Sequence, residues 1–414
     1  ICKHFGICGG CQLQDLSYEE QLELKKRNIE FFFKDLKNKP IDKIIPSPKE
    51  IYYRNRMDYV VGKEKIENKE KIIIGLKEKG KWWKVVDLEE CFLMSKEADL
   101  IKNLFKEFVN QKKLSAWDLK EHKGLLRYLI IREGKFTNER MLIINTSNDY
   151  LNKGFKSNKK EKLSEEEKKE KEKIEQIFLE FYDLLKEQGI KIDSFIHGVN
   201  NTITDISFNF EVNVLKGKEL IKEKLNSFYF LIGPNSFFQS NSYTADLMVE
   251  EVKQIIKEIK EEKETNNLID LYCGEGTFSI PYYKYFNKIL GIELNKESIK
   301  LYNKNLELNK IKEKEKFFLV ASSVEKATKK EEIRKFFNKD SLLIVDPPRS
   351  GLNKRVIELI KKSNIENMIY ISCNYKTQYR DIKMLGFELK KLMMVDQFPQ
   401  TTHVETIALL DRKK

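Results

Sequence analysis

The chain has 414 residues, 41% of them hydrophobic, and is long enough to build two or three domains with sizeable cores. Its formal net charge of +12 favours polyanionic partners such as RNA. No apolar run approaches the roughly 18 residues of a membrane span, and the first residues lack the zones of a signal peptide. We therefore expect a cytoplasmic protein without a membrane partner.

Four cysteines in the first quarter of the chain suggest a metal centre. Cys2, Cys8 and Cys11 are spaced Cys-x5-Cys-x2-Cys, and Cys91 lies further along. Disulfides are disfavoured in a reducing cytosol, and the glycines of "CGGC" allow the backbone to wrap tightly around a bulky centre. Four thiolates suit zinc or a 4Fe-4S cluster. Only one short cysteine pair is present, which favours the cluster.

The next 200 residues predict an α+β domain. Ser17 and Glu20 form a capping box that opens a helix after the cysteine loop. A charged insertion (152–176), dense in both signs, indicates a solvated segment leading into a helix. The remaining pattern indicates short strands at 56–63, 124–131 and 140–147, and helices near 96–110 and 166–188.

From about residue 235 the sequence alternates regularly between helical and strand patterns. This alternation predicts an α/β, Rossmann-like, doubly wound and mostly parallel sheet. We therefore expect an N-terminal α+β domain (1–230) that carries the cluster loop (1–95), followed by a second domain (231–414). The expected helices include 242–262 and 296–309, and the expected strands are 267–271, 288–292, 316–320, 341–345 and 367–372.

Residues that suit a nucleotide-like cofactor follow the first two of these strands. Asp270 stands near the end of the first strand, and Gly274 and Gly276 lie in the next turn, where the backbone can approach a ligand closely. Glu293 follows about 20 residues later and can hold ribose hydroxyls. Because "CGEGTF" lacks the third glycine of a dinucleotide motif, the pattern favours S-adenosylmethionine.

The later strand ends carry reactive groups. Asp346 is followed by two prolines, which make a rigid strand tip. Cys373 ends the fifth strand beside the cofactor turn, where a thiol is positioned as a nucleophile. Glu405, near His403, can take a proton. A free cysteine is otherwise most often simply buried, which is what we expect of Cys273.

Together these motifs resemble the iron–sulfur branch of the RNA uridine C5-methyltransferases, which make 5-methyluridine with S-adenosylmethionine. The resemblance covers nearly the whole chain. It includes the four early cysteines, and "DPPRSGL", "SCN" and "HVE" in this order are a specific combination. The other matching segments are "FFQSN" (237–241), "DLYCGEGTF", "GIELN" and "FPQTTHVE".

The resemblance also implies a role for individual residues. Cys373 would be the nucleophile and Glu405 the base, while Phe237, Arg349 and His403 would bind the substrate base. Thr277 and Ser323 depart from the family, since relatives can have asparagine at these positions. The implied cofactor contacts are Gln239, Tyr272, Gly274, Thr277, Glu293, Ser323 and Asp346, and the implied cluster ligands are Cys2, Cys8, Cys11 and Cys91.

The RNA substrate is less defined than the chemistry. The resemblance favours 23S rRNA, and a tRNA uridine is the alternative. Many relatives carry a small RNA-binding β-barrel ahead of the cluster segment, whereas this sequence begins at that segment, so RNA affinity is expected on basic faces of the central domain. We expect a monomer. Two rival hypotheses are a non-catalytic RNA-binding protein, and an enzyme that methylates an exocyclic amino group through the Asp-Pro-Pro tip.

Overall fold

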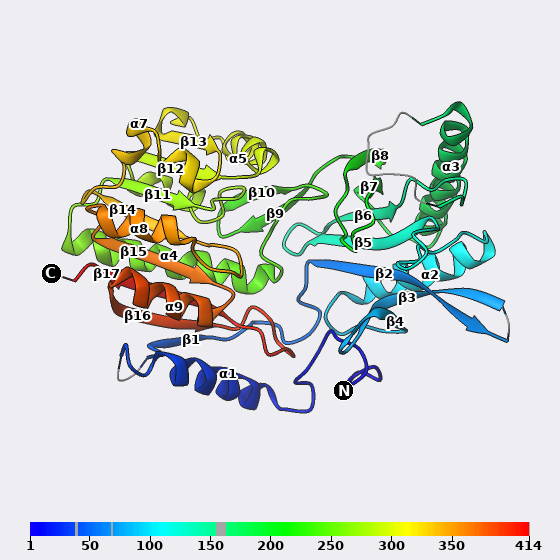
Figure 1. Cartoon of the computed structure of the whole chain (residues 1–414), viewed down its shortest axis with the longest axis horizontal. Helices are drawn as coiled ribbons and strands as arrows, with labels where there is room; N and C mark the ends of the chain where they lie inside the picture. Colours follow the sequence, from blue (N-terminus) through cyan, green and yellow to red (C-terminus); the bar gives the residue numbers. More distant parts are fainter. Residues whose placement is uncertain (38–39, 68, 155–162, 414) are drawn as a thin grey trace. The chain divides into compact units, whose positions relative to one another are not determined.

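The structure is a computed structural model that describes residues 1–37, 40–67, 69–154 and 163–413. The chain forms two compact units (Figure 1). The first unit comprises residues 1–15, 51–223 and 232–235, and the second unit comprises residues 16–50, 224–231 and 236–414.

A mostly antiparallel sheet with two helices builds the first unit. The strands are β2 (Arg56–Ile66), β3 (Lys69–Glu78), β4 (Lys81–Asp87), β5 (Leu126–Gly134), β6 (Glu139–Thr146), β7 (Ser194–Val199) and β8 (Glu211–Gly217), and the helices are α2 (Lys96–Gln111) and α3 (Glu165–Glu187). In the described residues the strand order is β4-β3-β2-β5-β6-β7-β8. β6 and β7 are parallel because α3 provides the crossover between them. The ring of Phe181 on α3 lies 5.0 Å from Phe105 and 5.2 Å from Phe108 on α2.

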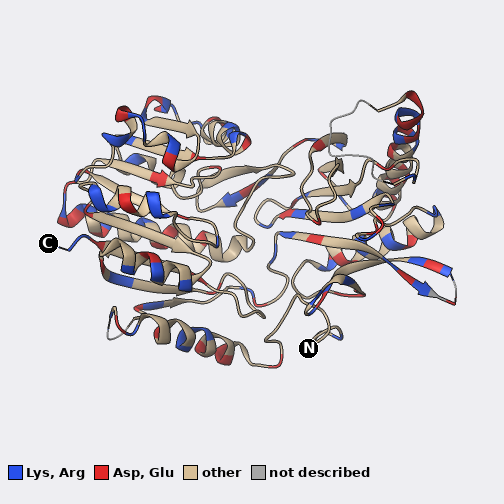
Figure 2. Ribbon diagram, in the orientation of Figure 1, with Lys and Arg blue, Asp and Glu red and all other residues tan. Residues whose placement is uncertain are grey.

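The charged insertion predicted at 152–176 ends in α3. Residues 155–162 of the insertion lie outside the described part of the chain. Ser164 caps α3 in a capping box with Glu167, and Ile174 and Phe178 are buried on the inner face of the helix. Figure 2 shows acidic and basic residues alternating along α3. The charge run is therefore the solvated face of an amphipathic helix.

The second unit is a mixed α/β layer structure. Its sheet strands are β1 (Lys43–Ile45), β11 (Asn267–Leu271), β12 (Lys288–Glu293), β13 (Phe317–Ala321), β14 (Ser341–Val345), β15 (Asn367–Ser372), β16 (Glu388–Val395) and β17 (Glu405–Asp411). They lie in the order β1-β16-β17-β15-β14-β11-β12-β13 among the described residues, and β17 runs antiparallel to its neighbours. The helices are α1 (Tyr18–Phe33), α4 (Ser242–Glu262), α5 (Lys296–Leu308), α6 (Val324–Ala327), α7 (Glu331–Arg334), α8 (Lys354–Lys362) and α9 (Tyr375–Leu385), with 3-10 turns at η1 (Ile280–Tyr285) and η2 (Lys314–Lys316). A separate hairpin pairs β9 (Ile221–Leu225) with β10 (Phe228–Ile232).

The predicted alternation of helices and strands after residue 235 is confirmed. The strands 267–271, 341–345 and 367–372 and the helix 242–262 have the predicted bounds. The strand predicted at 288–292 and the helix predicted at 296–309 differ by one residue at the C-terminal end, and the strand predicted at 316–320 lies one residue later. The capping box of Ser17 and Glu20 is also present at the start of α1. Within the described residues, no helix combines the length and the apolar composition needed to cross a bilayer.

Residues 16–50 pack into the second unit, whereas the sequence predicts that they belong to the first domain (1–230). Ile29 and Phe33 on α1 are fully buried in its core, where the ring of Phe33 lies 5.6 Å from that of Tyr379 on α9. β1 extends the sheet by pairing in parallel with β16. Both packing partners lie more than 300 residues downstream, so local sequence patterns gave no sign of this arrangement.

A buried ion pair fixes α1 to the loop after β16. Lys25 Nζ lies 2.6 Å from Asp396 Oδ1, with both side chains almost fully buried, and it also donates to the Phe398 carbonyl at 3.1 Å. Burial lowers the pKa of Lys25 from its usual value, and the Asp396 carboxylate opposes that shift. Removing one partner leaves the other charge buried and uncompensated.

We predict that Lys25→Ala lowers the free energy of unfolding of the second unit by about 3–5 kcal/mol, because it strands the Asp396 carboxylate. Lys26→Ala is the matched control, since Lys26 is partly exposed and forms only a surface pair with Glu23, and it should cost less than about 0.5 kcal/mol. Urea denaturation followed by circular dichroism measures both variants. Equal small losses in the two variants would show that the buried pair does not hold α1.

Candidate active site

The carboxyl ends of the parallel strands meet at one edge of the second unit's sheet, and β17 brings its first residue to the same edge because it runs the opposite way. The chain order reverses between β11 and β14, which makes this edge the switch point where such sheets bind ligands. The predicted residues follow the strands in spatial order. From β17 to β13 these are Glu405, Cys373, Asp346, Tyr272, Gly274, Thr277, Glu293 and Ser323.

Strand register places the expected nucleophile opposite the expected base. Ser372 pairs with Thr406 in the antiparallel ladder of β15 and β17. The next residues along this register are Cys373 and Glu405, which therefore face each other at the edge. Asp346 follows β14, the neighbour of β15 on its other side. Three chemically active side chains thus come from three adjacent strands.

The turn after β11 forms an open cradle. Gly274 and Gly276 have φ of +52° and +92°, and Tyr272 before them has φ of +66°. A side chain at Gly276 would overlap Ile280 and Tyr302, whereas the space beside the Gly274 Cα is open. The Gly274 N–H donates to Glu293 Oε2 at 3.2 Å, which joins the turn to the end of β12. The glycines are therefore required by the backbone conformation and by the close packing behind the turn.

Carboxyl groups dominate this part of the edge. Asp270 is buried beneath the turn, and its Oδ2 has no hydrogen-bond partner among the described residues. Burial raises the pKa of Asp270 to about 7, an effect that the nearby Asp346 and Glu293 reinforce. Together with Glu293 and Asp346, the turn offers acceptors and negative charge. This set suits the ammonium, sulfonium and ribose hydroxyls of S-adenosylmethionine and opposes a pyrophosphate.

Thr277 and Ser323 both lie at the part of the sheet edge formed by the ends of β11 and β13. Thr277 lies in the glycine turn and is half-buried, and Ser323 is the first residue before the short helix α6, directly after β13. The Ser323 side chain makes no capping hydrogen bond to α6. Their positions agree with those of cofactor contacts, and their roles stay a prediction.

Two glutamine side chains, Gln397 and Gln239, orient Asp346 through a chain of hydrogen bonds. Gln397 Nε2 donates to Gln239 Oε1 at 3.2 Å, and Gln239 Nε2 donates to Asp346 Oδ2 at 3.3 Å. The first bond fixes which end of the Gln239 amide faces Asp346. Burial raises the pKa of Asp346 to about 7. The chain therefore presents the aspartate in a defined orientation at the strand tip.

Asn374 ties the nucleophile segment to the Asp-Pro-Pro-Arg segment. Its side chain caps α9 by accepting from the Lys376 N–H at 3.2 Å and donates to the Arg349 carbonyl at 3.0 Å. Thr377 Oγ1 also donates to that carbonyl, at 3.3 Å. A capping asparagine directly after Cys373 therefore holds Arg349 beside the thiol.

The electrostatics of Cys373 and Glu405 depend on the groups around them. Burial raises the pKa of the half-buried Cys373 thiol to about 11, and the neighbouring Glu405 and Asp346 add to this shift. Arg349 hydrogen-bonds the thiol and counters them. Glu405 is buried, and burial followed by the proximity of Asp346 raises its pKa well above the usual range. Glu405 therefore binds a proton more strongly than an exposed carboxylate does.

Two predicted substrate residues are exposed near this edge. Phe237 precedes α4 with 68% of its surface accessible, so a ring face is free for a ligand base. His403 is exposed just before β17, and its ring lies edge-on to Phe398 at 6.1 Å. Cys273, in contrast, is buried in the glycine turn. These positions agree with a stacking role for Phe237 and with a packing role for Cys273.

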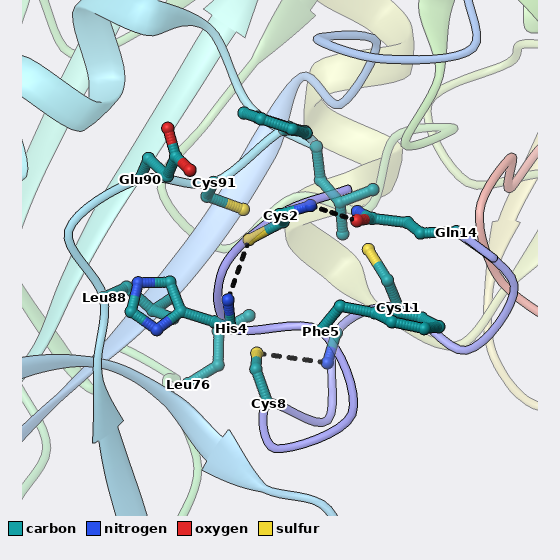
Figure 3. A pocket seen from close by; sticks show the side chains of 13 residues that line it. Cys2, His4, Phe5, Cys8, Cys11, Gln14, Leu76, Leu88, Glu90 and Cys91 are labelled. Atoms are coloured by element: carbon teal, nitrogen blue, oxygen red, sulfur yellow. Dashed lines mark hydrogen bonds between the residues drawn. The ribbon is translucent and has the colours of Figure 1, made fainter.

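The four early cysteines lie in the first unit, where they line one pocket (Figure 3). The His4 N–H donates to Cys2 Sγ at 3.4 Å, and the Gly10 N–H donates to Cys8 Sγ at 3.3 Å. Burial raises the pKa of Cys11 to about 12 and that of Cys91 to about 11. Within residues 1–37, 40–67, 69–154 and 163–413, no histidine, cysteine or acidic side chains form a ready metal-ligand group.

Comparison with known proteins identifies the family. The model of the tRNA (Uracil-5-)-methyltransferase family matches residues 165–413. The chain belongs to this family. It is 37% identical over 414 residues to an RNA methyltransferase of Nanoarchaeum equitans, covering 100% of this chain and 80% of the relative. It is 35% identical over 409 residues to the tRNA (uracil(54)-C(5))-methyltransferase of Pyrococcus horikoshii, covering 99% and 85%.

A solved structure supports the same conclusion. The crystal structure of Pyrococcus abyssi tRNA (uracil-54, C5)-methyltransferase in complex with S-adenosyl-L-homocysteine superposes with a TM-score of 0.71 at 30% identity. The match covers 98% of this chain and 86% of that chain. The protein is thus an S-adenosylmethionine-dependent RNA (uracil-C5)-methyltransferase. The non-catalytic hypothesis and the exocyclic amino-group hypothesis are both wrong.

The sequence interpretation missed two buried residues of this methyltransferase. The sequence pattern identifies Asp270 only as a strand-end acid, outside the implied cofactor contacts, and it gives Gln397 no role. Gln397 acquires its position only because β16 lies beside β17 and ends at the same edge. The sole sequence signal for Gln397 is its place just after the apolar run of residues 392–395.

We predict that Arg349→Gln moves the alkylation of Cys373 to higher pH. Iodoacetamide reacts with the thiolate, and loss of the guanidinium raises the thiol pKa further above the value of about 11 in the parent protein. Mass spectrometry of the Cys373 peptide across a pH series measures the rate. Arg355→Gln, an exposed change on α8, is the control and should leave the profile unchanged. Identical profiles for all three proteins would exclude the contact between Arg349 and the thiol.

Proposed function

We propose that the chain methylates carbon 5 of uridine 54 in tRNA. The observation that carries this proposal is 35% identity to a tRNA (uracil(54)-C(5))-methyltransferase over 99% of the chain. The solved structure of a tRNA (uracil-54, C5)-methyltransferase is similar over 98% of the chain. These comparisons favour the tRNA alternative over the 23S rRNA substrate that the sequence resemblance favoured.

Cys373 is proposed as the nucleophile. Its thiolate adds to carbon 6 of the uracil, and the electrons of the 5,6 double bond move to oxygen 4 as an enolate. Arg349 favours the thiolate form, which counters the burial and the carboxyl groups that oppose it. Phe237 stacks on the uracil face once the base leaves its RNA stack. The addition makes carbon 5 electron-rich enough to take a methyl group.

S-adenosylmethionine, when bound, supplies that methyl group as an electrophile on a sulfonium. The glycine turn, Glu293 and Asp346 are proposed to hold it, together with Gln239, Tyr272, Thr277 and Ser323. Glu405 then takes the proton from carbon 5. The electrons of that C–H bond restore the double bond as the Cys373 sulfur leaves carbon 6, so one methyl replaces one proton. The raised proton affinity of Glu405 suits a base that acts late in the reaction.

We predict that Cys373→Ala abolishes methyl transfer and that Glu405→Gln stops the reaction after methylation. The second variant should accumulate an RNA-linked protein, because the proton on carbon 5 is not removed and the thiol cannot leave. Denaturing gels with labelled tRNA detect the adduct. Glu388→Gln, an exposed carboxyl change at the far end of β16, is the control. Normal turnover by Cys373→Ala would refute the nucleophile assignment.

The substrate is tested with two tRNA transcripts that differ only at position 54. The transcript with uridine should gain one methyl group, and the transcript with cytidine should gain none. A 23S rRNA transcript is offered in parallel. Methylation of the rRNA alone would overturn the tRNA proposal and leave the uracil-C5 chemistry standing.

We also propose that Cys2, Cys8, Cys11 and Cys91 bind a 4Fe-4S cluster. Two observations support it. The four cysteines share one pocket, and backbone N–H groups donate to two of the sulfurs, as occurs around iron–sulfur centres. Burial opposes bare thiolates here, and a bound metal centre that replaces the protons removes that opposition. The cluster would stabilise the loop and has no step in the methyl transfer.

Anaerobically purified protein is therefore expected to contain four irons and four sulfides per chain. Cys8→Ser should lose this content and the visible absorbance of the cluster, because it removes one thiolate ligand. Cys273→Ala, a change at a buried cysteine of the second unit, should retain both. Stoichiometric zinc in place of iron would favour the zinc alternative, and no metal in either protein would reject the proposal.

A further inference from the structure

Two adjacent tryptophans are exposed on the edge strand β4 of the first unit. Trp82 and Trp83 have 65% and 51% of their surface accessible, and their ring centroids lie 5.9 Å apart in an edge-to-face arrangement. The third tryptophan of the chain, Trp117, is buried. A contiguous exposed patch of large aromatic side chains is typical of an interaction site.

Lysines flank these two tryptophans in the sequence. Residues 77–84 contain Lys77, Lys79, Lys81 and Lys84 against one acid, Glu78, which is a net charge of 4 − 1 = +3. Glu78 pairs with both Lys81 and Lys84, and Lys77 pairs with Asp205. If the negative charge of Asp205 is included, the net charge of the segment is +2. Figure 2 shows the basic and acidic positions on β3 and β4. Aromatic rings within positive charge match the chemistry of unpaired nucleotides.

The cysteine loop, residues 2–11, forms backbone hydrogen bonds with the tip of this hairpin. The register between β2 and β3 ends at Gly75, and beyond it the free edge of β3 is taken by the loop. The Gly9 N–H donates to the Lys77 carbonyl at 2.9 Å, and the Lys79 N–H donates to the Ile7 carbonyl at 2.8 Å. A Cβ at Gly9 would lie 3.1 Å from the Lys77 carbonyl oxygen, so a larger residue would crowd this contact. The order of the loop therefore sets the order of the hairpin.

We infer that the hairpin of residues 76–86, called here the tryptophan hairpin, stacks on unpaired bases of the RNA substrate outside the target uridine, and that the cysteine loop positions it for this. The inference rests on the proposed function in that the substrate is RNA. A second copy of the chain is a poorer fit, because pairing the same edge in two copies would bring two lysine-rich segments together. The hairpin belongs to the first unit, whereas Cys373 and Glu405 belong to the second unit.

The direct test is quenching of tryptophan fluorescence by tRNA. Stacked bases quench exposed indoles, so tRNA should quench the parent protein and a Trp82→Phe/Trp83→Phe variant should lose most of the quenching while binding with nearly the parent Kd. Trp82→Ala/Trp83→Ala removes both stacking faces, and its Kd should rise by at least about tenfold. Phe31→Ala, at an equally exposed aromatic residue on α1, is the control and should keep the parent Kd.

Two further measurements separate charge from stacking and test the link to the loop. Lys79→Gln/Lys81→Gln/Lys84→Gln should lower the magnitude of the salt slope of log K by about two, since roughly 0.7 counterion is released per contact to single-stranded RNA. Cys8→Ser, which alters the loop but keeps both tryptophans, should weaken the quenching by tRNA and raise the Kd, with circular dichroism confirming that the sheet remains folded.

An unchanged Kd for the folded two-alanine variant would overturn the inference. A parent dimer that becomes a monomer in this variant, with unchanged RNA affinity, would assign the surface to a second copy and would also overturn it. Failure of the proposed function is distinguishable, because the parent protein would then bind and be quenched by tRNA without forming 5-methyluridine.

Discussion

The antiparallel insertion of β17 between β15 and β16 is the constraint on which the candidate site depends. In a fully parallel sheet, the residue that begins a strand lies at the edge opposite the ligand. Because β17 is reversed, its first residue, Glu405, meets the last residues of β15 at the ligand edge, and the register places it opposite Cys373. β16 runs in the same direction as β15 and therefore ends at this edge too, which brings Gln397 to Gln239 and through it to Asp346. One reversed strand between two strands of the ordinary direction thus assembles the reactive half of the site.

Burial then raises the pKa values of the reactive groups at this edge. Cys373, Asp346 and Glu405 all have raised pKa values because they lie in a poorly solvated place beside one another. A raised pKa suits a carboxylate that must take a proton, but it opposes a thiol that must lose one. Arg349 relieves that opposition at the thiol, and Asn374 and Thr377 hold the Arg349 backbone in place. In the proposed mechanism, the positive side chain of Arg349 therefore keeps the nucleophile and the base compatible at close range.

The sequence predicted most of what depends on local patterns. Alternating apolar runs located the strands after residue 235, and Ser17 with Glu20 located the start of α1. The motif residues Cys373, Asp346 and Glu405 lie at strand ends. The sequence shows their order along the chain, but their order along the sheet follows only from the strand order in the structure. Three things depend on long-range packing and were not predicted. These are the placement of α1 and β1 in the second unit, the burial of Asp270 with an unpaired oxygen, and the contact of Gln397 with Gln239. A short polar pair such as Asp396 and Gln397 has the same sequence pattern whether it is buried or exposed to solvent.

The central claim is a transient bond between the Cys373 sulfur and carbon 6 of the target uracil, formed while a methyl donor is within reach. It is tested most directly with tRNA that carries 5-fluorouridine at position 54, because fluorine cannot be removed as a proton and the adduct persists. Protein incubated with this tRNA and S-adenosylmethionine, then digested and analysed by mass spectrometry, should carry a methylated fluorouridine on the Cys373 peptide. A nucleotide attached to any other residue, or no attached nucleotide despite methylation of ordinary tRNA, would contradict the account.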